Sequence, residues 1–302
     1  PIIALGNKFF ESYNKLPESE QKKTMEFFNK FRQNPLSSAI NYEKLNAVAD
    51  KRMRSVRIGK AYRGIIMLDE ESAVYLLLWV DHHDEAYAWA KNKKCKINPS
   101  TGVIQLYDMQ ESTVGKTEAP TVGIFSHLSD DILEKLGVPR ELFDLVRGIK
   151  NKNDLVSKSN MLPDDVYAGL ELIEEGNSIE ETLEVSVPKI KVKIAEGDYR
   201  TAIEIDANKG SYYVIKDEDN MEDVLSLASW RIFLHQSQRA IVDNDYKNSF
   251  YVSGGAGTGK TVVAMHRAKR LAQSLGRGKK LLFTTFTKDL IKDIKANLEE
   301  LC

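Results

Sequence analysis

One run of small residues near the C-terminal end could bind phosphate groups. The segment Gly254-Gly255-Ala256-Gly257-Thr258-Gly259-Lys260-Thr261 fits the pattern G-x-x-x-x-G-K-[ST] at every fixed position. Its glycines would let the backbone turn so that N–H groups point at phosphate oxygens. Lys260 would pair with the β- and γ-phosphates, and the Thr261 hydroxyl would bind Mg²⁺. The alternative is a glycine-rich turn that binds no nucleotide.

A phosphate-binding loop of this kind needs a strand before it and a helix after it. Phe250–Ser253 predicts a short apolar strand, and alanines and leucines recur at helical spacing between 264 and 275 before Gly276. A second strand is predicted at Lys280–Thr284, followed by a helix with apolar residues at 290, 294 and 298. Together they predict a parallel βαβ unit whose first helix points its positive end at the phosphates.

Charge is distributed unevenly along the 302 residues, although the net charge is only -1. Residues 1–95 carry 16 basic against 12 acidic side chains, residues 96–229 carry 14 against 26, and residues 230–302 carry 13 against 6. Any nucleic acid is therefore expected to contact the two ends.

The sequence disfavours a disulfide-stabilised secreted protein and a membrane protein. Two cysteines, Cys95 and Cys302, give no disulfide framework or metal spacing, which favours reduced thiols in the cytoplasm. The N-terminus does not resemble a signal peptide, and no apolar run approaches the roughly 20 residues of a membrane span, so no membrane partner is expected.

The first 95 residues predict a compact α+β domain. Strands are expected at 2–5, 53–58, 62–68 and 74–80, and helices at 7–16 and 18–33, where aromatic residues recur at helical spacing. The resulting β-α-α-β-β-β order ends near Trp89.

The middle of the chain is predicted from weaker signals. Residues 96–128 are interpreted as a connection, with a strand at 103–107, and residues 129–184 as a helical segment. Residues 185–229 alternate in polarity, which fits either short strands or an extended linker, and we take them as the linker. Residues 230–302 form the last predicted domain.

Three segments in that last domain resemble motifs of superfamily 1 helicases of the UvrD/Rep type. Leu234–Arg239 is similar to the Q motif, Gly254–Thr261 to motif I, and Leu281–Lys288 to motif Ia, with Lys288 in place of the family's common Asn. The resemblance implies a RecA-like fold, binding of ATP with Mg²⁺, and a single-stranded or tailed DNA partner. It implies that Gln238 contacts adenine and that Thr285, Phe286 and Thr287 lie near DNA; a core position for Phe286 is the alternative. Because no acidic Walker B run precedes Cys302, the chain is expected to be the front part of a longer helicase that does not turn over ATP by itself.

The first 90 residues resemble RelE/ParE-type toxin domains. The resemblance rests on short patterns in the same order, including Arg54-Ser55-Val56-Arg57-Ile58, Tyr62-Arg63 and Asp81-His82-His83-Asp84-Glu85-Ala86-Tyr87. It implies that RNA or the ribosome is the partner of this domain. It also implies that Arg57, Arg63 and Tyr87 would act on an RNA phosphate, with His82 or His83 as general acid or base. The alternative is structural: the arginines are paired charges on a strand, the histidines cap a sheet edge, and Tyr87 belongs to the core.

Three functions remain open at this point. The first is an ATP-binding front end of a DNA helicase with a RelE-like accessory domain. The second is a RelE-like endoribonuclease with a regulatory nucleotide-binding C-terminal part. The third is a non-catalytic module that only binds nucleic acid.

Overall fold

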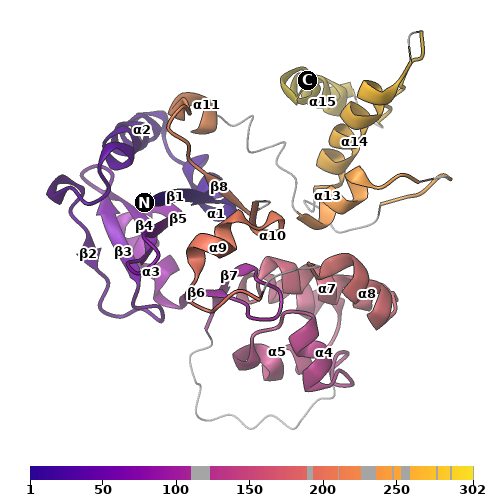
Figure 1. The fold of residues 1–302 in the computed structure, drawn as a ribbon, viewed down its shortest axis with the longest axis horizontal. Helices are drawn as coiled ribbons and strands as arrows, with labels where there is room; N and C mark the ends of the chain where they lie inside the picture. The colour runs from indigo at the N-terminus through magenta and orange to yellow at the C-terminus, as the bar shows by residue number, and fades with distance from the viewer. Residues whose placement is uncertain are drawn as a thin grey trace. The chain divides into compact units, whose positions relative to one another are not determined.

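The computed structural model describes residues 1–109, 123–188, 193–209, 211–225, 236–246, 248–252, 259–276, 278–285 and 288–301. The chain divides into two compact units, Pro1–Lys216 and Asp217–Cys302, and each is described by itself (Figure 1). Within the described ranges, no helix combines the length and the apolar character needed to cross a membrane.

The first unit is built on a six-stranded mixed sheet. Its strands lie in the order β2-β3-β4-β5-β1-β8, with β1 parallel to β5 and the other neighbours antiparallel. The first elements along the chain are β1 (Ile2–Gly6), α1 (Asn7–Tyr13), α2 (Glu18–Gln33), η1 (Ser38–Ile40), β2 (Glu43–Lys44), β3 (Met53–Arg57), β4 (Tyr62–Asp69), β5 (Val74–His82) and α3 (His83–Lys91). Helices and a mixed sheet agree with the α+β prediction, and the strands and helices expected in residues 1–80 are present.

Aromatic side chains hold α1 and α2 on the sheet. Pro17 precedes α2, acidic residues occupy its first turn and basic residues its last, which is the charge order that a helix dipole favours. Phe28 meets Phe9 of α1 edge to face at 5.5 Å, and Phe31 meets Tyr75 of β5 at 5.7 Å. The three-residue spacing of the aromatics therefore marks the buried side of α2, as the sequence predicted.

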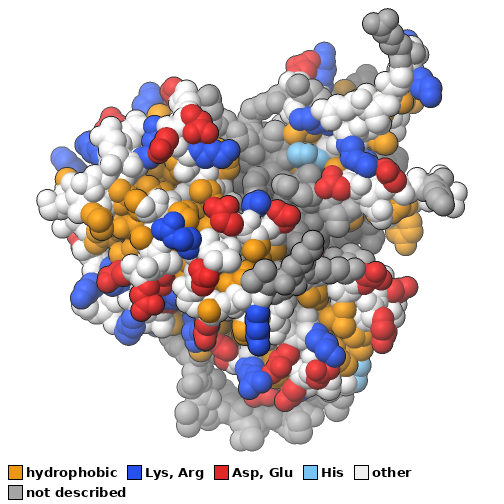
Figure 2. Space-filling view, in the orientation of Figure 1, with side chains coloured by type: hydrophobic (Ala, Val, Ile, Leu, Met, Phe, Trp, Pro, Cys, Tyr) orange, Lys and Arg blue, Asp and Glu red, His pale blue; other side chains and the backbone are white. Residues whose placement is uncertain are grey.

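Two further parts of the first unit follow α3 directly along the chain. The strands β6 (Lys93–Ile97) and β7 (Ile104–Asp108) form an antiparallel hairpin. A helical segment with its own apolar core follows, made of α4 (Asp130–Lys135), η2 (Arg140–Leu142), α5 (Phe143–Arg147), α6 (Lys152–Ser157), η3 (Ser159–Met161), α7 (Asp164–Glu174) and α8 (Ile179–Ser186). Figure 2 shows Asp and Glu side chains gathered where α7 and α8 lie, as the acidic middle of the sequence led us to expect.

The segment after α8 differs from the extended linker that the sequence predicted over 185–229. It contains α9 (Tyr199–Glu204), α10 (Asp206–Lys209), β8 (Tyr212–Val214) and α11 (Met221–Leu225). β8 pairs with β1 at the edge of the sheet, and Tyr199, Ala202 and Ile203 are buried in the core of the sheet. Partners distant in sequence organise this segment: Asn208 accepts a hydrogen bond from the Ile104 N–H at 2.8 Å and donates to the carbonyl of Gly102 at 3.0 Å. These contacts could not be predicted from the local sequence pattern alone.

The second unit is helical in its described residues. Besides α11, it contains α13 (Gln236–Asp243), α14 (Lys260–Ser274) and α15 (Lys288–Leu301). Val242 and Val263 join α13 to α14, while Met265, Ile294 and Leu301 join α14 to α15. The predicted helices after the phosphate-binding loop and after residue 287 are therefore present.

The predicted βαβ unit is contradicted in the described residues. Neither 250–252 nor 280–285 forms a strand, and Tyr251 and Leu282 are 89% and 86% exposed. A strand needs a neighbouring strand to pair its backbone groups, and the described part of this unit offers none. These two runs have the apolar pattern of strands, but within the described residues no neighbouring strand pairs with them.

Candidate functional site

The N-terminus of α14 is shaped by Gly259. This residue precedes the helix with φ +80° and ψ +18°, in the left-handed region that favours glycine, and its carbonyl accepts from the Val263 N–H at 3.0 Å. Lys260 is the first helical residue and is half-buried, whereas Thr261 is exposed. The other loop residues of the sequence prediction, Gly254, Gly255, Ala256, Gly257 and Thr258, lie outside the described residues.

Gln238 of α13 lies against this helix start. A Cβ added to Gly259 would stand only 2.4 Å from Gln238 Nε2, so glycine at this position leaves the space that the amide occupies. The two helices that carry these residues pack through Val242 and Val263. The structure therefore brings together two residues that the sequence assigned to one nucleotide site, although 21 positions separate them.

Arg267 of α14 fixes the end of α13 that packs on it. Its Nη1 donates to the carbonyl oxygens of Ile241, Val242 and Asn244 at 3.2, 3.0 and 2.8 Å. These carbonyls are at the C-terminal end of α13, where a cation satisfies free acceptors and the helix dipole. The guanidinium also lies 4.8 Å from the ring centroids of both Tyr246 and Phe250. The loop that leads to the phosphate-binding segment is thus anchored to α14, a contact that the sequence reading missed.

The predicted DNA-contacting residues are only partly described. Thr285 is half-buried at the end of the 278–285 segment, whereas Phe286 and Thr287 lie outside the described residues. Phe283, two positions earlier, packs on the Met265, Ile294 and Leu301 cluster between α14 and α15. The segment that contains Thr285 is therefore attached to the two helices without forming the expected strand.

Residues 234–302 match the family model of the UvrD/REP helicase N-terminal domain. This range contains Gln238, Gly259, Lys260 and Thr261, so the match covers the site just described. No curated protein and no solved structure matches the chain. The UvrD-like helicase part of the sequence interpretation is supported for this segment, and the RelE-like part receives no support from these comparisons.

A second group of polar side chains lies at one end of the sheet in the first unit. The Tyr87 hydroxyl of α3 donates to Glu43 Oε2 at 3.1 Å, and Ser55 Oγ of β3 donates to the same oxygen at 3.3 Å. Arg63 of β4 places its Nε 3.8 Å from that oxygen. We call these four residues, Glu43, Ser55, Arg63 and Tyr87, the polar cluster. The sequence singled out Arg63 and Tyr87 but missed Glu43, because the two-residue strand that carries it has no recognisable pattern.

Arg63 is unusual for a buried charge. Only 8% of the residue is exposed, and its Nη1 donates to the Tyr62 carbonyl at 3.1 Å. Its Nε has no hydrogen-bond partner although the atom is buried. Buried donors without a partner are rare because desolvation costs free energy that no contact returns. Arg63 Nε thus lies within ion-pair distance of the Glu43 carboxylate but makes no hydrogen bond.

Arg57, His82 and His83 lie around the polar cluster. Arg57 is exposed and stands directly opposite Arg63 in the β3–β4 register. His83 Nδ1 lies 2.8 Å from Asp84 Oδ1, and the His83 ring centroid lies 6.4 Å from that of Tyr87. The ligand-type atoms of His82, His83 and Asp84 fall within 4.8 Å of one another, so they could hold a cation or transfer a proton. All four residues predicted for a RelE-like site, Arg57, Arg63, His83 and Tyr87, therefore belong to one region.

Proposed function

We propose that residues 234–302 bind ATP with Mg²⁺ as part of a UvrD-like DNA helicase. Lys260 would contact the β- and γ-phosphates and Thr261 would hold Mg²⁺. Gln238 would contact the adenine edge, and the segment Gly254–Gly259 would offer its backbone N–H groups to the phosphates. Mg²⁺ and ATP supply the chemistry of phosphoryl transfer, for which this segment supplies positioning and positive charge.

One observation carries the proposal. The amide of Gln238 lies against the left-handed Gly259, which directly precedes Lys260 at the N-terminus of a 15-residue helix. Backbone N–H groups of the first turn and the helix dipole favour an anion at this place. The match of 234–302 to the helicase family supports the same assignment.

Nucleotide binding by the full chain tests the proposal. Wild type, Lys260→Ala and Lys280→Ala would be titrated with a fluorescent ATP analogue, with and without Mg²⁺. Lys280 is an exposed lysine of the same unit and serves as the matched control. We expect the Lys260 variant to lose at least tenfold in affinity and the Lys280 variant to stay within twofold. Equal affinities of wild type and Lys260→Ala would disprove the assignment.

The helicase that contains this ATP-binding part would bind and unwind DNA. Thr285, Phe286 and Thr287 would face single-stranded or tailed DNA, and unwinding would be an activity of the whole helicase. Thr285→Ala is expected to weaken binding of tailed DNA while leaving ATP-analogue affinity unchanged. Loss of both would instead indicate a damaged fold.

A second function is favoured by the unsatisfied buried donor of Arg63. The polar cluster with Arg57 and His83 would act on RNA: Arg57 and Arg63 would bind the phosphate, and Glu43 would accept the proton of the 2′-hydroxyl. The 2′-oxygen would attack phosphorus, the bond to the 5′-oxygen would break, and His83 would protonate the leaving oxygen. The products would be a 2′,3′-cyclic phosphate and a 5′-hydroxyl.

RNA cleavage distinguishes catalysis from binding alone. End-labelled RNA would be incubated with wild type, Arg63→Ala, and Arg54→Ala as a control on the other face of β3. Cleavage by wild type that is lost only in Arg63→Ala supports the ribonuclease. RNA binding without cleavage by wild type supports the non-catalytic module, and absence of both contradicts this second function.

A further inference from the structure

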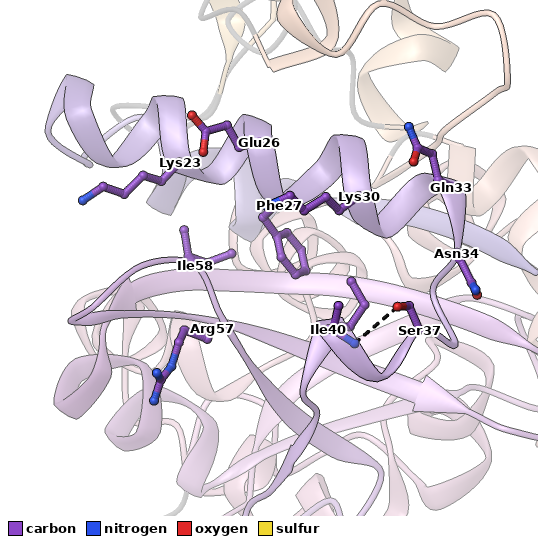
Figure 3. A pocket seen from close by; sticks show the side chains of 11 residues that line it. Lys23, Glu26, Phe27, Lys30, Gln33, Asn34, Ser37, Ile40, Arg57 and Ile58 are labelled. Atoms are coloured by element: carbon purple, nitrogen blue, oxygen red, sulfur yellow. Dashed lines mark hydrogen bonds between the residues drawn. The ribbon is translucent and has the colours of Figure 1, made fainter.

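A groove separates the second half of α2 from the end of β3. Its volume is about 330 Å³, and Phe27, Ile40 and Ile58 are apolar residues that line it (Figure 3). The Phe27 side chain points from α2 toward the β3 side, between Ile58 and Ile40. Ligand pockets span about 300–1,000 Å³, so this groove has room for a short stretch of a single strand and not for a duplex.

Three basic side chains line the groove against one acid. Lys23, Lys30 and Arg57 contribute the positive charges, and Glu26 is the acid. Figure 3 shows the Glu26 carboxylate pointing away from Phe27 and from the β3 end. The field within the groove is therefore positive, which suits a phosphate chain.

Two of these cations are available to a ligand. Lys23 Nζ is held by Glu20 Oε1 at 2.6 Å. Lys30 and Arg57 are exposed, and within the described residues their charged groups have no ion pair or hydrogen bond. Unpaired charges beside one groove are the feature that phosphate contacts require.

Arg57 connects the groove to the polar cluster. Side chains alternate along β3, so Ser55 and Arg57 point to the sheet face that carries Tyr87, while Val56 and Ile58 point to the α2 face. Arg57 nevertheless lines the groove, and its guanidinium points away from α2 in Figure 3. It stands opposite Arg63 across β3 and β4. A strand in the groove would thus pass Arg57 on its way to Arg63.

The polar residues of the groove favour RNA over DNA. Gln33 and Asn34 are exposed and Ser37 is half-buried, and all three line the groove. Amides and hydroxyls can both donate to and accept from a 2′-hydroxyl, which is the group that distinguishes the two nucleic acids.

We propose that this groove binds the sugar-phosphate chain of single-stranded RNA and leads it over Arg57 to the polar cluster. The proposal rests on the second function proposed above, RNA as the ligand of that cluster. Lys30 and Arg57 contact phosphates, and Gln33 and Asn34 contact ribose hydroxyls.

Binding of a labelled 12-nucleotide RNA to the full chain tests the groove. Fluorescence anisotropy would be measured over a salt series for wild type, Lys30→Ala and Lys30→Glu, with Lys22→Ala and Lys22→Glu as controls. Lys22 lies on the same helix, is 72% exposed and does not line the groove. We expect a tenfold or larger loss for Lys30→Glu, and for Lys30→Ala a log–log salt slope that is shallower by about 0.7, the value of one single-strand phosphate contact. The Lys22 variants are expected to match wild type.

The outcomes separate the groove from the cluster. If Arg63→Ala weakens RNA binding and Lys30→Glu does not, the groove proposal is disproved and the proposed function of the polar cluster stands. If wild type binds no RNA, both proposals are disproved. A DNA strand of the same sequence that binds as tightly as the RNA would overturn the choice of RNA. Thermal unfolding of each variant shows whether lost binding reflects lost fold.

Discussion

Gln238 Nε2 occupies the space in which a Gly259 side chain would stand, because a Cβ there would approach the amide nitrogen to 2.4 Å. Gly259 also has a φ of +80°, which residues with a side chain adopt at a cost. Two independent requirements thus fix glycine at the start of α14. The relationship holds the proposed adenine-contacting residue next to the proposed phosphate-contacting lysine.

The first prediction concerns Gly259→Ala. We expect at least a tenfold loss of ATP-analogue affinity, because the left-handed backbone and the position of Gln238 cannot both be kept. Strain at such a position is on the order of 1–2 kcal/mol. Gly276→Ala is the control, since a Cβ there meets nothing within 4 Å. Thermal unfolding of the variant shows whether lost affinity reflects a lost fold, and unchanged affinity in Gly259→Ala would contradict the prediction.

The second prediction concerns Asp165 at the start of α7. Burial raises its pKa to about 7, while Gln105 Nε2 donates to its Oδ2 at 2.8 Å and limits the rise. Between the ordinary pKa near 4 and about 7, the folded state holds a proton that the unfolded state has lost. The contribution of Asp165 to folded stability is therefore most favourable at low pH and is lost as pH rises through this range.

Asp165→Asn removes the charge and keeps an acceptor for Gln105. At pH 8 we expect the variant to be more stable than wild type by about 1 kcal/mol, or roughly 2–4 °C in a unit of this size. At pH 5 the difference is expected to shrink. Thermal unfolding at several pH values measures this, with exposed Asp144→Asn as the control. A wild-type advantage at pH 8 would contradict the prediction.

Periodicity predicted those elements whose partners lie nearby in sequence. The aromatic spacing in α2 and the apolar runs of β3, β4 and β5 indicated elements that the structure contains, because each buries its own face against a close neighbour. The strands predicted at 250–253 and 280–284 were wrong in their described residues, because an apolar run does not by itself provide a neighbouring strand.

The site residues, too, could be predicted only where a local sequence motif marked them. Arg63 and Tyr87 could be proposed from short patterns, but Glu43, which joins them, is placed by a two-residue strand paired with Ser55. Gln238 and Lys260 were proposed from motifs, and helix packing through Val242 and Val263 explains their proximity. Contacts between residues that only the tertiary fold brings together could not be predicted from local sequence patterns.

The third prediction concerns the Tyr199 hydroxyl. It donates to the Cys95 carbonyl at 2.9 Å and accepts from Arg52 Nη1 at 2.8 Å in a buried position. Tyr199→Phe removes both of these buried hydrogen bonds, one of them to a charged group, while Arg52 still donates to the Cys95 carbonyl and pairs with Asp50. We expect a loss of about 1–3 kcal/mol in the free energy of unfolding. Urea unfolding followed by circular dichroism measures it. Tyr167→Phe is the control, because that hydroxyl makes only a 3.5 Å contact to Glu171. A loss below 0.5 kcal/mol for Tyr199→Phe would show that water replaces the hydroxyl.

The fourth prediction concerns the extent of the N-terminal folding unit. β8 completes the sheet beside β1, and Tyr199, Ala202 and Ile203 fill its core, so residues 1–95 alone would expose apolar side chains and an edge strand. We expect residues 1–216 to unfold cooperatively as a monomer and residues 1–95 to aggregate or to lack a cooperative transition.

Ile203→Ala in the 1–216 chain makes that test quantitative. The side chain is 1% exposed, and removing it should cost about 2–5 kcal/mol because a cavity remains in the core. Exposed Val156→Ala, in the helical segment, is the matched control with an expected change below 0.5 kcal/mol. If residues 1–95 instead fold cooperatively and Ile203→Ala is neutral, the segment from 193 to 216 is an appendage, and the N-terminal domain ends where the sequence first suggested.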